Sequence, residues 1–442
     1  MRSGLAKVLH RLDGRPLINH VCETALSLKP KSLNIVIGHQ GDDVKRAVAA
    51  EFGEGKAEFA MQKQQLGTGD AVNSAKSKLR GRDSILLVLS GDVPLISSAT
   101  LRALVQKHKR SKAACTILTV ELGDPTGYGR IVRDDAGKFS RIVEQKDASE
   151  TERSCREINS GIYCFDTKKL FRALGKIGND NAQGEYYLTD VPTILNAAGD
   201  VVALFLHNDP NEIEGVNDRS QLAAMEAEIR RRTVRRLMLE SGVSFIDPSA
   251  AYVSSKAKVG RDTVICQNVT IEGKSIIGEN CVLRPGVRIV NAEIGNHTEI
   301  KDNSFITDSV IGDGCAVGPM AHLRGRAVVS DGAKIGNFVE LKKTKLGRGS
   351  KASHLTYLGD ATIGEDTNIG AGTITCNYDG KNKHETHIGK NVKIGSDTML
   401  VAPVKVGDGA VTGAGTVVTK DIMPNKLVVG APARTIKDLD GK

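Results

Sequence analysis

The chain has 442 residues, 40% hydrophobic and 26% charged, which is ordinary for a globular protein and long enough for two or three domains. Its net charge is +9, but only 4% of the residues are aromatic and no nucleic-acid-binding motif occurs, so we expect small anionic substrates and no nucleic-acid partner. No apolar run approaches the ~18 residues of a membrane span, the start MRSGLAKVLH lacks a signal-peptide core, and the eight cysteines form no CxxC pair, which predicts a cytoplasmic protein with reduced thiols and no membrane insertion.

The first half, from residue 1 to about 218, alternates short apolar runs with helical patterns. The strand-like runs lie at 34–38, 57–62, 84–89 and 114–120, and the helical patterns lie at 16–28, 42–52, 69–79 and 99–109. This order predicts a mostly parallel α/β sheet, whose ligands bind at the carboxyl ends of the strands. A helix is expected over 219–242, and its basic run RRRTVRR is interpreted as a solvated face.

Polar residues suited to ligand binding lie in several loops of this half. Gln62 precedes QLGTGDA (65–71), a glycine-rich turn before a helix that can present backbone N–H groups to a base or phosphate. Asp92 follows an apolar run in SGDVP, and its carboxylate suits a hard cation such as Mg²⁺. Further loops supply Gly129, Glu144, Asn159 and Asn217.

The second half repeats an aliphatic residue followed by glycine. Gly312 to Gly318 and Gly389 to Gly395 are steps of six residues, and Gly260 to Gly278 is a step of eighteen. A period of six predicts a hexapeptide parallel β-helix, in which three hexads make one coil and the aliphatic residues stack inside it. One coil cannot bury its own apolar face, so we expect the stability to come from stacking on neighbouring coils.

The repeat is interrupted in four places, LRGRAVVSDG, NFVELKKTKLG, SKASHLTYLGD and TITCNYDGKNKHETHIG. Loops and functional residues are commonly found where the repeat of a solenoid is interrupted. His354, in SHLTYLGD, is a natural general base for an attacking amine near neutral pH, although a lone histidine is more often structural.

Over essentially its whole length the chain resembles the bacterial bifunctional N-acetylglucosamine-1-phosphate uridyltransferase/glucosamine-1-phosphate N-acetyltransferase family, whose product UDP-N-acetylglucosamine serves cell-wall synthesis. The matching segments are KVLH, QLGTG, GDVPLI, DPTGYGRI, VEQKDA, EINSGIY, NAQGEYYLTD, EGVN, HLTYLGD and NIGAGTITCNYDG. The resemblance implies an α/β nucleotide-diphospho-sugar transferase (Rossmann-like) domain over 1–218, a linker helix over 219–242 and a left-handed parallel β-helix of hexapeptide repeats over 243–442. It also implies a homotrimer with acetyl-transfer sites between neighbouring prisms.

For the first half, the resemblance implies in-line attack of N-acetylglucosamine 1-phosphate on the α-phosphate of UTP, with Mg²⁺ and positioning supplying most of the catalysis. Its UDP-N-acetylglucosamine site would consist of Lys7 at phosphate, of Gln62, Gly67 and Thr68 at uridine, of Gly129, Glu144 and Asn159 at the sugar, and of Asp92 and Asn217 as ligands of Mg²⁺.

For the second half, the resemblance implies direct acetyl transfer from acetyl-CoA to the amine of glucosamine 1-phosphate, without a covalent enzyme intermediate. Its site would consist of His354 as the base, Arg324 and Lys342 at the sugar phosphate, Tyr357 and Asn368 at the sugar, Asn377 and Tyr378 beside the acetyl group, and Ala371, Ser396 and Ala414 against coenzyme A.

The chain departs from the family pattern in several positions. Family members open with a strand and the phosphate loop LAAGxGTRM, and Met1 matches the last residue of that motif, so we expect weak or absent uridyl transfer from the chain as given. Ser90 stands where the family has tyrosine, and Asp70 stands where histidine is frequent. In the second half, LRGR (323–326) replaces LRPG, and a familiar late arginine is displaced to Arg434, with Ala431 at its position.

Two other functions are compatible with this domain order. One is a sugar nucleotidyltransferase whose β-helix only regulates, as in ADP-glucose or GDP-mannose pyrophosphorylases, but those lack HLTYLGD and TCNYDG. The other is a non-catalytic assembly subunit, as in the related translation-initiation exchange factors. The retained His354, Asn377 and Lys342 argue against the second.

Overall fold

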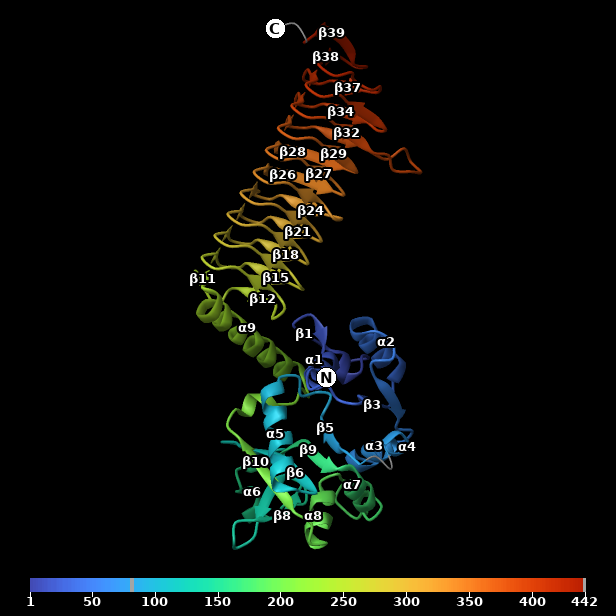
Figure 1. The fold of residues 1–442 in the computed structure, drawn as a ribbon, viewed down its shortest axis with the longest axis vertical. Helices are drawn as coiled ribbons and strands as arrows, with labels where there is room; N and C mark the ends of the chain where they lie inside the picture. Colours follow the sequence, from blue (N-terminus) through green and yellow to red (C-terminus); the bar gives the residue numbers. More distant parts are fainter. Residues whose placement is uncertain (80–82, 440–442) are drawn as a thin grey trace. The chain divides into compact units, whose positions relative to one another are not determined.

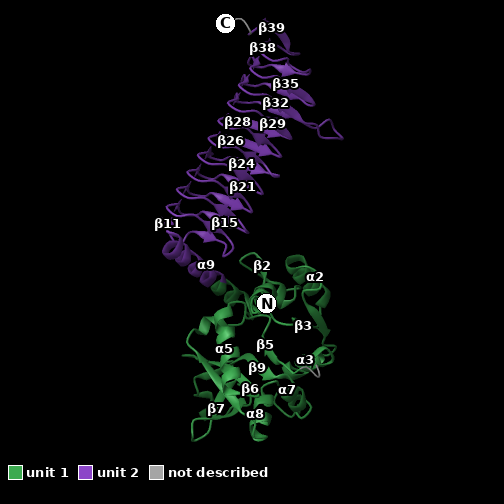
Figure 2. Cartoon of the chain, viewed as in Figure 1, with its two compact units in different colours: residues 1–225 green, residues 226–442 purple. Residues whose placement is uncertain are grey.

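A computed structural model describes residues 1–79 and 83–439, and the chain forms two compact units (Figure 1 and Figure 2). Unit 1 comprises Met1–Met225 and unit 2 comprises Glu226–Lys442. The division falls inside helix α9 (Arg219–Ser241), which lies where the linker helix is expected. Within the described part of the chain, none of the helices is both long and apolar enough to span a membrane.

The described helices of unit 1 include η1 (Lys7–Leu9), α1 (Leu17–Ser27), α2 (Gly41–Phe52), α3 (Thr68–Ser74), α4 (Lys76–Leu79), α5 (Ser98–Ser111), α6 (Glu150–Arg153), α7 (Thr167–Leu174), α8 (Asp190–Ala197) and η2 (Pro210–Ile213). Helices α1 to α5 lie close to the predicted positions, and the sequence did not predict the other five. Helix α5 shows why these segments form helices. The side chain of Ser97 caps the helix by accepting a hydrogen bond from the backbone N–H of Thr100, and Leu101 and Leu104 are fully buried on one face.

The strands of unit 1 are β1 (Arg11–Leu12), β2 (Arg15–Pro16), β3 (Asn34–Ile37), β4 (Glu58–Met61), β5 (Ile85–Val88), β6 (Cys115–Glu121), β7 (Arg130–Arg133), β8 (Phe139–Val143), β9 (Glu157–Asp166) and β10 (Val202–His207). The main sheet has the order β10-β6-β9-β7-β8, and β5 also pairs with β9. Strands β3 and β4 form a separate parallel pair.

The prediction of a mostly parallel sheet is wrong. In the main sheet β10 and β6 are parallel, whereas β9 runs antiparallel to β5, β6 and β7, and β7 runs antiparallel to β8. Residues 130–166, where no strand was expected, supply these antiparallel strands. Parallel neighbours need a crossover of about a dozen residues or more, and the turn between β7 and β8 is too short for one.

Unit 2 is a parallel β-solenoid whose strands stack in three columns, as the repeat predicts (Figure 1). The first column contains β11 (Ser244–Phe245), β14 (Val264–Ile265), β17 (Val282–Leu283), β20 (Glu299–Ile300), β23 (Ala316–Val317), β30 (Asn368–Ile369), β33 (Lys393–Ile394), β36 (Val411–Thr412) and β38 (Lys426–Val429). The second contains β12 (Tyr252–Val253), β15 (Thr270–Glu272), β18 (Arg288–Val290), β21 (Phe305–Thr307), β24 (His322–Arg324), β31 (Ile374–Cys376), β34 (Met399–Val401) and β37 (Val417–Val418). The third contains β13 (Lys258–Val259), β16 (Ile276–Ile277), β19 (Glu293–Ile294), β22 (Val310–Ile311), β25 (Val328–Val329), β27 (Lys345–Leu346), β29 (Ala361–Ile363), β32 (Thr386–Ile388) and β35 (Val404–Val406).

The aliphatic residues of the repeat form the core of the solenoid. Ile277, Ile294 and Ile311 stack in successive coils and are 2%, 3% and 1% exposed. The glycine that follows the aliphatic residue of a repeat is required by close packing between coils. At Gly260, for example, a Cβ atom would lie 2.7 Å from the backbone nitrogen of Glu279. The aliphatic side chains are therefore buried only when the neighbouring coils cover them, so each coil depends on its neighbours for stability.

Two features depart from the regular repeat. Strands β26 (Lys334–Lys342) and β28 (Lys351–Gly359) continue around the corner between the first and second columns instead of ending there. Between β31 and β32 the chain makes a longer excursion, so that Ile363 pairs with Ile388, a step of 25 residues (388 − 363), and a loop projects from the stack near β32 (Figure 1). The last strand in the described residues is β39 (Arg434–Asp438), which pairs antiparallel with β38.

Candidate functional site

Three predicted ligands meet in unit 1 near the carboxyl end of β5. Nζ of Lys7, in η1, lies 2.5 Å from Oδ2 of Asp92 and 3.0 Å from Oδ1 of Asn217. The backbone N–H of Val216 donates to the carbonyl oxygen of Asp92 at 3.0 Å, which ties the segment before α9 to the loop after β5. The side-chain oxygens of Asp92 and Asn217 thus both contact the ammonium group of Lys7.

This pair of oxygens fits Mg²⁺ in composition. Mg²⁺ is usually bound by one or two protein carboxylate or amide oxygens, with substrate phosphates and water completing its shell. Asp92 and Asn217 would supply the protein part of such a site. Across 1–79 and 83–439 no cluster of three or more histidine, cysteine or acidic side chains could hold a metal without help from a substrate.

The predicted uridine residues lie at the turn between β4 and α3. Gln62 donates through Nε2 to the carbonyl oxygen of Gly67 at 3.2 Å and to Oδ2 of Asp70 at 2.9 Å. Gly67 has φ 111°, and a Cβ atom there would lie 2.7 Å from the carbonyl oxygen of Tyr186, so both conformation and space require glycine. Oγ1 of Thr68 accepts from the backbone N–H of Leu188 at 3.0 Å. The turn is therefore held by the segment that contains Tyr186 and Leu188.

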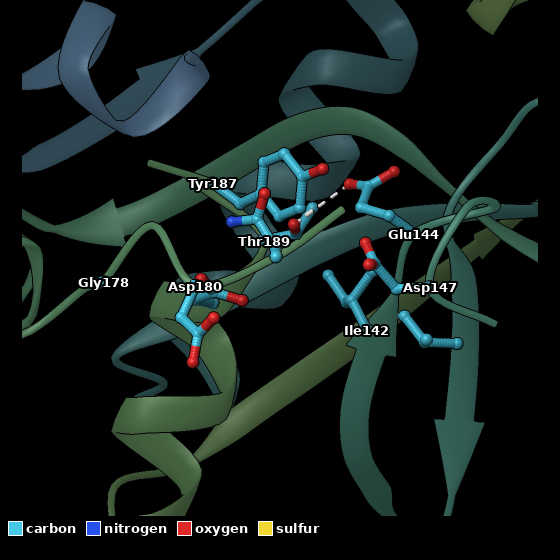
Figure 3. Close-up of a pocket in the computed structure, with 10 residues that line it drawn as sticks. Ile142, Glu144, Asp147, Gly178, Asp180, Tyr187 and Thr189 are labelled. Carbon is cyan, nitrogen blue, oxygen red and sulfur yellow. Dashed lines mark hydrogen bonds between the residues drawn. The ribbon is translucent and has the colours of Figure 1, made fainter. Parts of the chain in front are cut away.

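The same segment lines a cavity of about 340 Å³ in unit 1 (Figure 3). Oγ1 of Thr189 donates to Oε1 of Glu144 at 3.0 Å. Two other predicted sugar residues adjoin it: the backbone N–H of Asn159 donates to the carbonyl oxygen of Gly129 at 2.8 Å, and a Cβ atom on Gly129 would lie 3.4 Å from Oε2 of Glu144. The cavity is lined by Ile142, Val143, Glu144, Asp147, Gly178, Asp180, Asn181, Tyr187, Thr189 and Asp190.

In unit 2 the predicted base lies on the corner where β26 and β28 turn. His354 is in register with Asn337 of the previous coil, and Nδ1 of His354 lies 2.7 Å from Oδ1 of Asn337. Nδ1–H therefore donates to the carboxamide oxygen, which leaves the lone pair on Nε2. The side chain of His354 is exposed.

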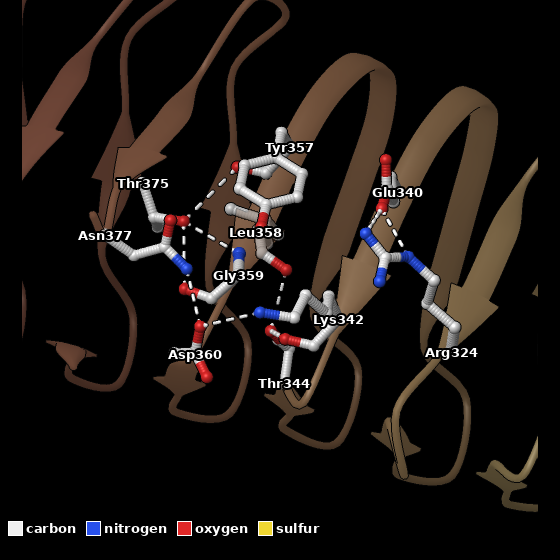
Figure 4. Close-up of polar contacts among 10 residues, drawn as sticks. All are labelled: Arg324, Glu340, Lys342, Thr344, Tyr357, Leu358, Gly359, Asp360, Thr375 and Asn377. Carbon is white, nitrogen blue, oxygen red and sulfur yellow. Dashed lines mark hydrogen bonds and ion pairs between the residues drawn. The ribbon is translucent and has the colours of Figure 1, made fainter. Parts of the chain in front are cut away.

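A buried charged group, the ammonium of Lys342, lies at the end of β26 (Figure 4). Lys342 is only 8% exposed, and its Nζ lies 3.2 Å from Oδ2 of Asp360. The same Oδ2 accepts from Nδ2 of Asn377 at 2.5 Å. A side chain at Gly359 would meet the ring of Tyr357 and lie 2.7 Å from Nδ2 of Asn377, so glycine leaves room for both groups.

Arg324 lies in the same part of the second column. Its Nε and Nη2 atoms are 2.7 Å and 2.6 Å from Oε1 of Glu340 in the next coil (Figure 4). Arg324 and Lys342 are themselves in register on β24 and β26. Two cations predicted at the sugar phosphate are thus neighbours, each held by one carboxylate.

The predicted coenzyme A residues form one column at a corner. A Cβ atom on Gly370 would lie 2.6 Å from the backbone nitrogen of Ser396, and one on Gly395 would lie 2.8 Å from that of Ala414. Ala371, Ser396 and Ala414 therefore follow one another at equivalent positions in successive coils. Asn368 begins β30 and pairs in register with Lys351 of β28, one coil before Lys393.

The comparisons with known proteins cover both units. A nucleotidyl transferase family model matches residues 2–210, a GMPPB C-terminal domain model matches 241–345, and a bacterial transferase hexapeptide (six repeats) model matches 385–420. The bifunctional protein GlmU of Pelobacter propionicus is 49% identical over 429 residues, 97% of this chain and 92% of the relative. That of Heliobacterium modesticaldum is 48% identical over 438 residues, 99% of this chain and 94% of the relative. The chain belongs to the GlmU family.

Membership of the GlmU family makes the chain a bifunctional acetyl- and uridylyltransferase. Enzymes of this family use Mg²⁺ for uridylyl transfer and acetyl-CoA for acetyl transfer. Because GlmU relatives match along both units, the prediction of an enzyme is confirmed, and neither a merely regulatory β-helix nor a non-catalytic assembly subunit is needed to explain the solenoid.

The structure adds residues that the sequence did not single out as site residues. Tyr187 and Thr189, in the segment NAQGEYYLTD, line the cavity with Glu144. In unit 2 the neighbouring Lys342 ammonium lowers the pKa of Lys383. The signal for Lys383 was its place in the interruption TITCNYDGKNKHETHIG, but its loop has no repeat from which a direction could be predicted.

Replacing Glu144 with glutamine is expected to raise the thermal stability near neutral pH. Burial raises the pKa of Glu144, and the nearby Asp147 and Asp190 raise it further, while the hydrogen bond from Thr189 opposes them. An acid whose pKa is higher in the folded state costs stability once ionised, and that cost is absent below the unfolded pKa of about 4.3. The increase in melting temperature should therefore be present at about pH 7 and disappear towards about pH 4.

Calorimetry of the wild-type chain and Glu144→Gln across this pH range checks the expectation. Glu150→Gln, on an exposed acid of α6, is the matched control and should change little at any pH. A stability gain from Glu144→Gln that is the same at both ends of the range would show that ionisation of Glu144 is not its cause.

Proposed function

We propose that residues 1–218 form the uridyltransferase domain, in which the sugar phosphate N-acetylglucosamine 1-phosphate attacks the α-phosphate of UTP and pyrophosphate leaves. Gln62, Gly67 and Thr68 hold the uridine, and the cavity at Glu144 holds the sugar. Lys7 contacts phosphate, and Asp92 and Asn217 ligate Mg²⁺, which when bound neutralises charge on the phosphates. The convergence of Asp92 and Asn217 on the Lys7 ammonium supports this assignment.

In the second half, residues 243–442 form the acetyltransferase domain, reached through the linker helix 219–242. The amine of glucosamine 1-phosphate attacks the thioester of acetyl-CoA, and Nε2 of His354 takes the proton that the amine loses. The hydrogen bond from Nδ1 to Asn337 keeps that lone pair available. Tyr357 and Asn368 contact the sugar, Asn377 and Tyr378 lie beside the acetyl group, and Ala371, Ser396 and Ala414 pack against coenzyme A.

The observation that carries the acetyl-transfer assignment is the pair of cations Arg324 and Lys342, which are in register on β24 and β26. Lys342 is buried, with the carboxylate of Asp360 3.2 Å from its ammonium. A third cation, Lys383, is close enough for the Lys342 ammonium to lower its pKa. Neighbouring cations suit the phosphate of an amino sugar phosphate, and His354 lies on β28, the strand that pairs with β26.

Replacing Lys383 with alanine is expected to raise the KM for glucosamine 1-phosphate about tenfold, with a smaller change in kcat, because a charge-assisted contact to phosphate is lost. Acetylation assays at varied sugar phosphate measure both constants. Lys383→Arg should recover part of the loss, and Lys381→Ala removes a lysine from the same loop as the matched control. An unchanged KM in Lys383→Ala would remove this lysine from the phosphate site.

The solenoid unit works as a homotrimer with its sites between neighbouring copies. Phe338 and Leu355, the residues that follow Asn337 and His354 at the corner of β26 and β28, are 54% and 62% exposed. Large apolar side chains gathered at a site are typical of a surface that another chain covers. Light scattering of the purified chain tests this assembly, and a mass of one or two copies would contradict it.

Acetyl transfer produces the N-acetylglucosamine 1-phosphate that uridylyl transfer consumes, so the two domains perform successive steps. The described cysteines are all free, which fits a reducing, cytoplasmic location. One pair of assays on the same preparation tests the function: thiol release from acetyl-CoA with glucosamine 1-phosphate, and pyrophosphate release from UTP with N-acetylglucosamine 1-phosphate. Absence of thiol release would contradict the assignment of residues 243–442, and a chain that binds neither UTP nor N-acetylglucosamine 1-phosphate would contradict the assignment of residues 1–218.

A further inference from the structure

The side-chain amide of Gln62 is oriented by its neighbours. Its Nε2 atom lies 3.2 Å from the carbonyl oxygen of Gly67 and 2.9 Å from Oδ2 of Asp70. A carbonyl and a carboxylate only accept hydrogen bonds, so the group of the amide that faces them must be the NH₂ group. Each of its two N–H groups has a partner, and the reversed orientation would place the amide oxygen against two other oxygens.

This orientation decides what Gln62 can offer to a ligand. Oε1, on the other side of the amide carbon, can only accept hydrogen bonds. Gln62 follows β4, precedes the turn at Gly67 and is half-buried, so the residue lies at the carboxyl edge of the β3–β4 pair, where ligands of α/β sheets bind.

An acceptor at this edge distinguishes pyrimidine bases. Uracil carries an N–H donor at ring position 3, whereas cytosine has an unprotonated acceptor nitrogen at the same position. A fixed acceptor that meets position 3 pairs with uracil and faces a second acceptor in cytosine. A site that hydrogen-bonds one substrate discriminates strongly against an analogue that leaves its polar groups unpaired.

We propose that Asp70 determines the base specificity of nucleotidyl transfer by holding the Gln62 amide with its oxygen towards position 3 of uracil. The inference rests on the proposed uridylyl transfer at this site. Asp70 is a positioning residue, because it acts on the nucleotide through Gln62. Its side chain comes from the first turn of α3, directly after the glycine-rich turn, so the turn that receives the nucleotide also orients the amide that reads the base.

Asp70→Asn tests this directly, since the new amide can donate to Gln62 and permit the reversed orientation. The ratio of kcat/KM for UTP to that for CTP, measured by pyrophosphate release, is expected to fall about tenfold or more. Asp70→Ala, which only removes the acceptor, should lower the ratio less. The matched control is Asp42→Asn, because Asp42 is an exposed acid in the first turn of α2.

Two further readouts separate the possible outcomes. Acetyl transfer by unit 2 should be unchanged in every variant. Calorimetric binding of UTP and CTP with Mg²⁺ reports specificity independently of turnover, and the affinity ratio should fall in parallel. A UTP-to-CTP ratio in Asp70→Asn and Asp70→Ala that equals the wild-type ratio overturns the role of Asp70. A wild-type chain that binds neither nucleotide overturns the proposed uridylyl transfer, and the inference with it.

Discussion

Replacing His354 with alanine is expected to lower acetyl transfer by about a hundredfold or more while pyrophosphate release from UTP stays unchanged. The reason is the geometry around its ring: Nδ1 lies 2.7 Å from Oδ1 of Asn337, which leaves Nε2 as the group that can take a proton from the attacking amine. Without the imidazole, the amine must lose its proton to water. Steady-state assays of both half-reactions on one preparation measure the effect.

The variants around His354 make this test specific. Asn337→Ala should lower acetyl transfer less than His354→Ala, because the base remains but its tautomer is no longer held. His387→Ala is the matched control, since His387 lies on β32 in the third column and pairs with Glu385 at 3.4 Å. A rate for His354→Ala within a few fold of the wild-type rate would remove His354 from the role of base.

Replacing Asp92 with asparagine is expected to produce the opposite pattern, a loss of pyrophosphate release of about a hundredfold or more with acetyl transfer intact. Asp92 supplies the charged oxygen of the pair that converges on the Lys7 ammonium, 2.5 Å from Nζ. Charge neutralisation by a divalent cation contributes several kcal/mol to phosphoryl transfer, and a neutral amide binds Mg²⁺ more weakly.

Titration with Mg²⁺ shows whether the loss arises at the metal. The Mg²⁺ concentration for half-maximal rate should rise in Asp92→Asn. Asp83→Asn is the matched control, because Asp83 lies just before β5, at the end of the strand away from Asp92, and pairs at 3.0 Å with Lys168. An unchanged Mg²⁺ dependence in Asp92→Asn would contradict the assignment of Asp92 as a metal ligand.

Helices α1 to α5 of unit 1 and the solenoid of unit 2 followed from local patterns, whereas α6, α7 and α8 were not predicted. The period of six needs only contacts between equivalent residues in adjacent coils, so the stack of Ile277, Ile294 and Ile311 could be read directly from the spacing. The mixed sheet of unit 1 could not be read in this way. Strand β9 pairs with β5, β6 and β7, and pairing partners far apart in sequence leave no periodic trace.

The site residues divide in the same way into those that a local pattern indicates and those that depend on long-range folding. His354 and Lys342 drew attention because they lie where the repeat is interrupted, whereas their residue roles stay predictions until the assays above are done. The effect of Lys342 on the pKa of Lys383 depends on how the excursion between β31 and β32 folds back, and the loop is closed by its own hydrogen bonds, such as that between Nε2 of His384 and Oδ2 of Asp379 at 2.7 Å. Such contacts are decided by backbone conformation, which a single sequence without a repeat does not specify.

The sequence by itself determined the solenoid and the succession of a nucleotidyl transferase half and a hexapeptide-repeat half, and it predicted the segments in which the chemistry lies. Periodicity and short motifs carry that information because each depends on residues close together in the chain or at a constant spacing. Only the tertiary structure decided that Asp70 accepts a hydrogen bond from Gln62, that Asp360 contacts both Lys342 and Asn377, and that Thr189 donates to Glu144. Hydrogen bonds of this kind depend on distances of about 3 Å between groups on different elements, and those distances exist only once the chain has packed.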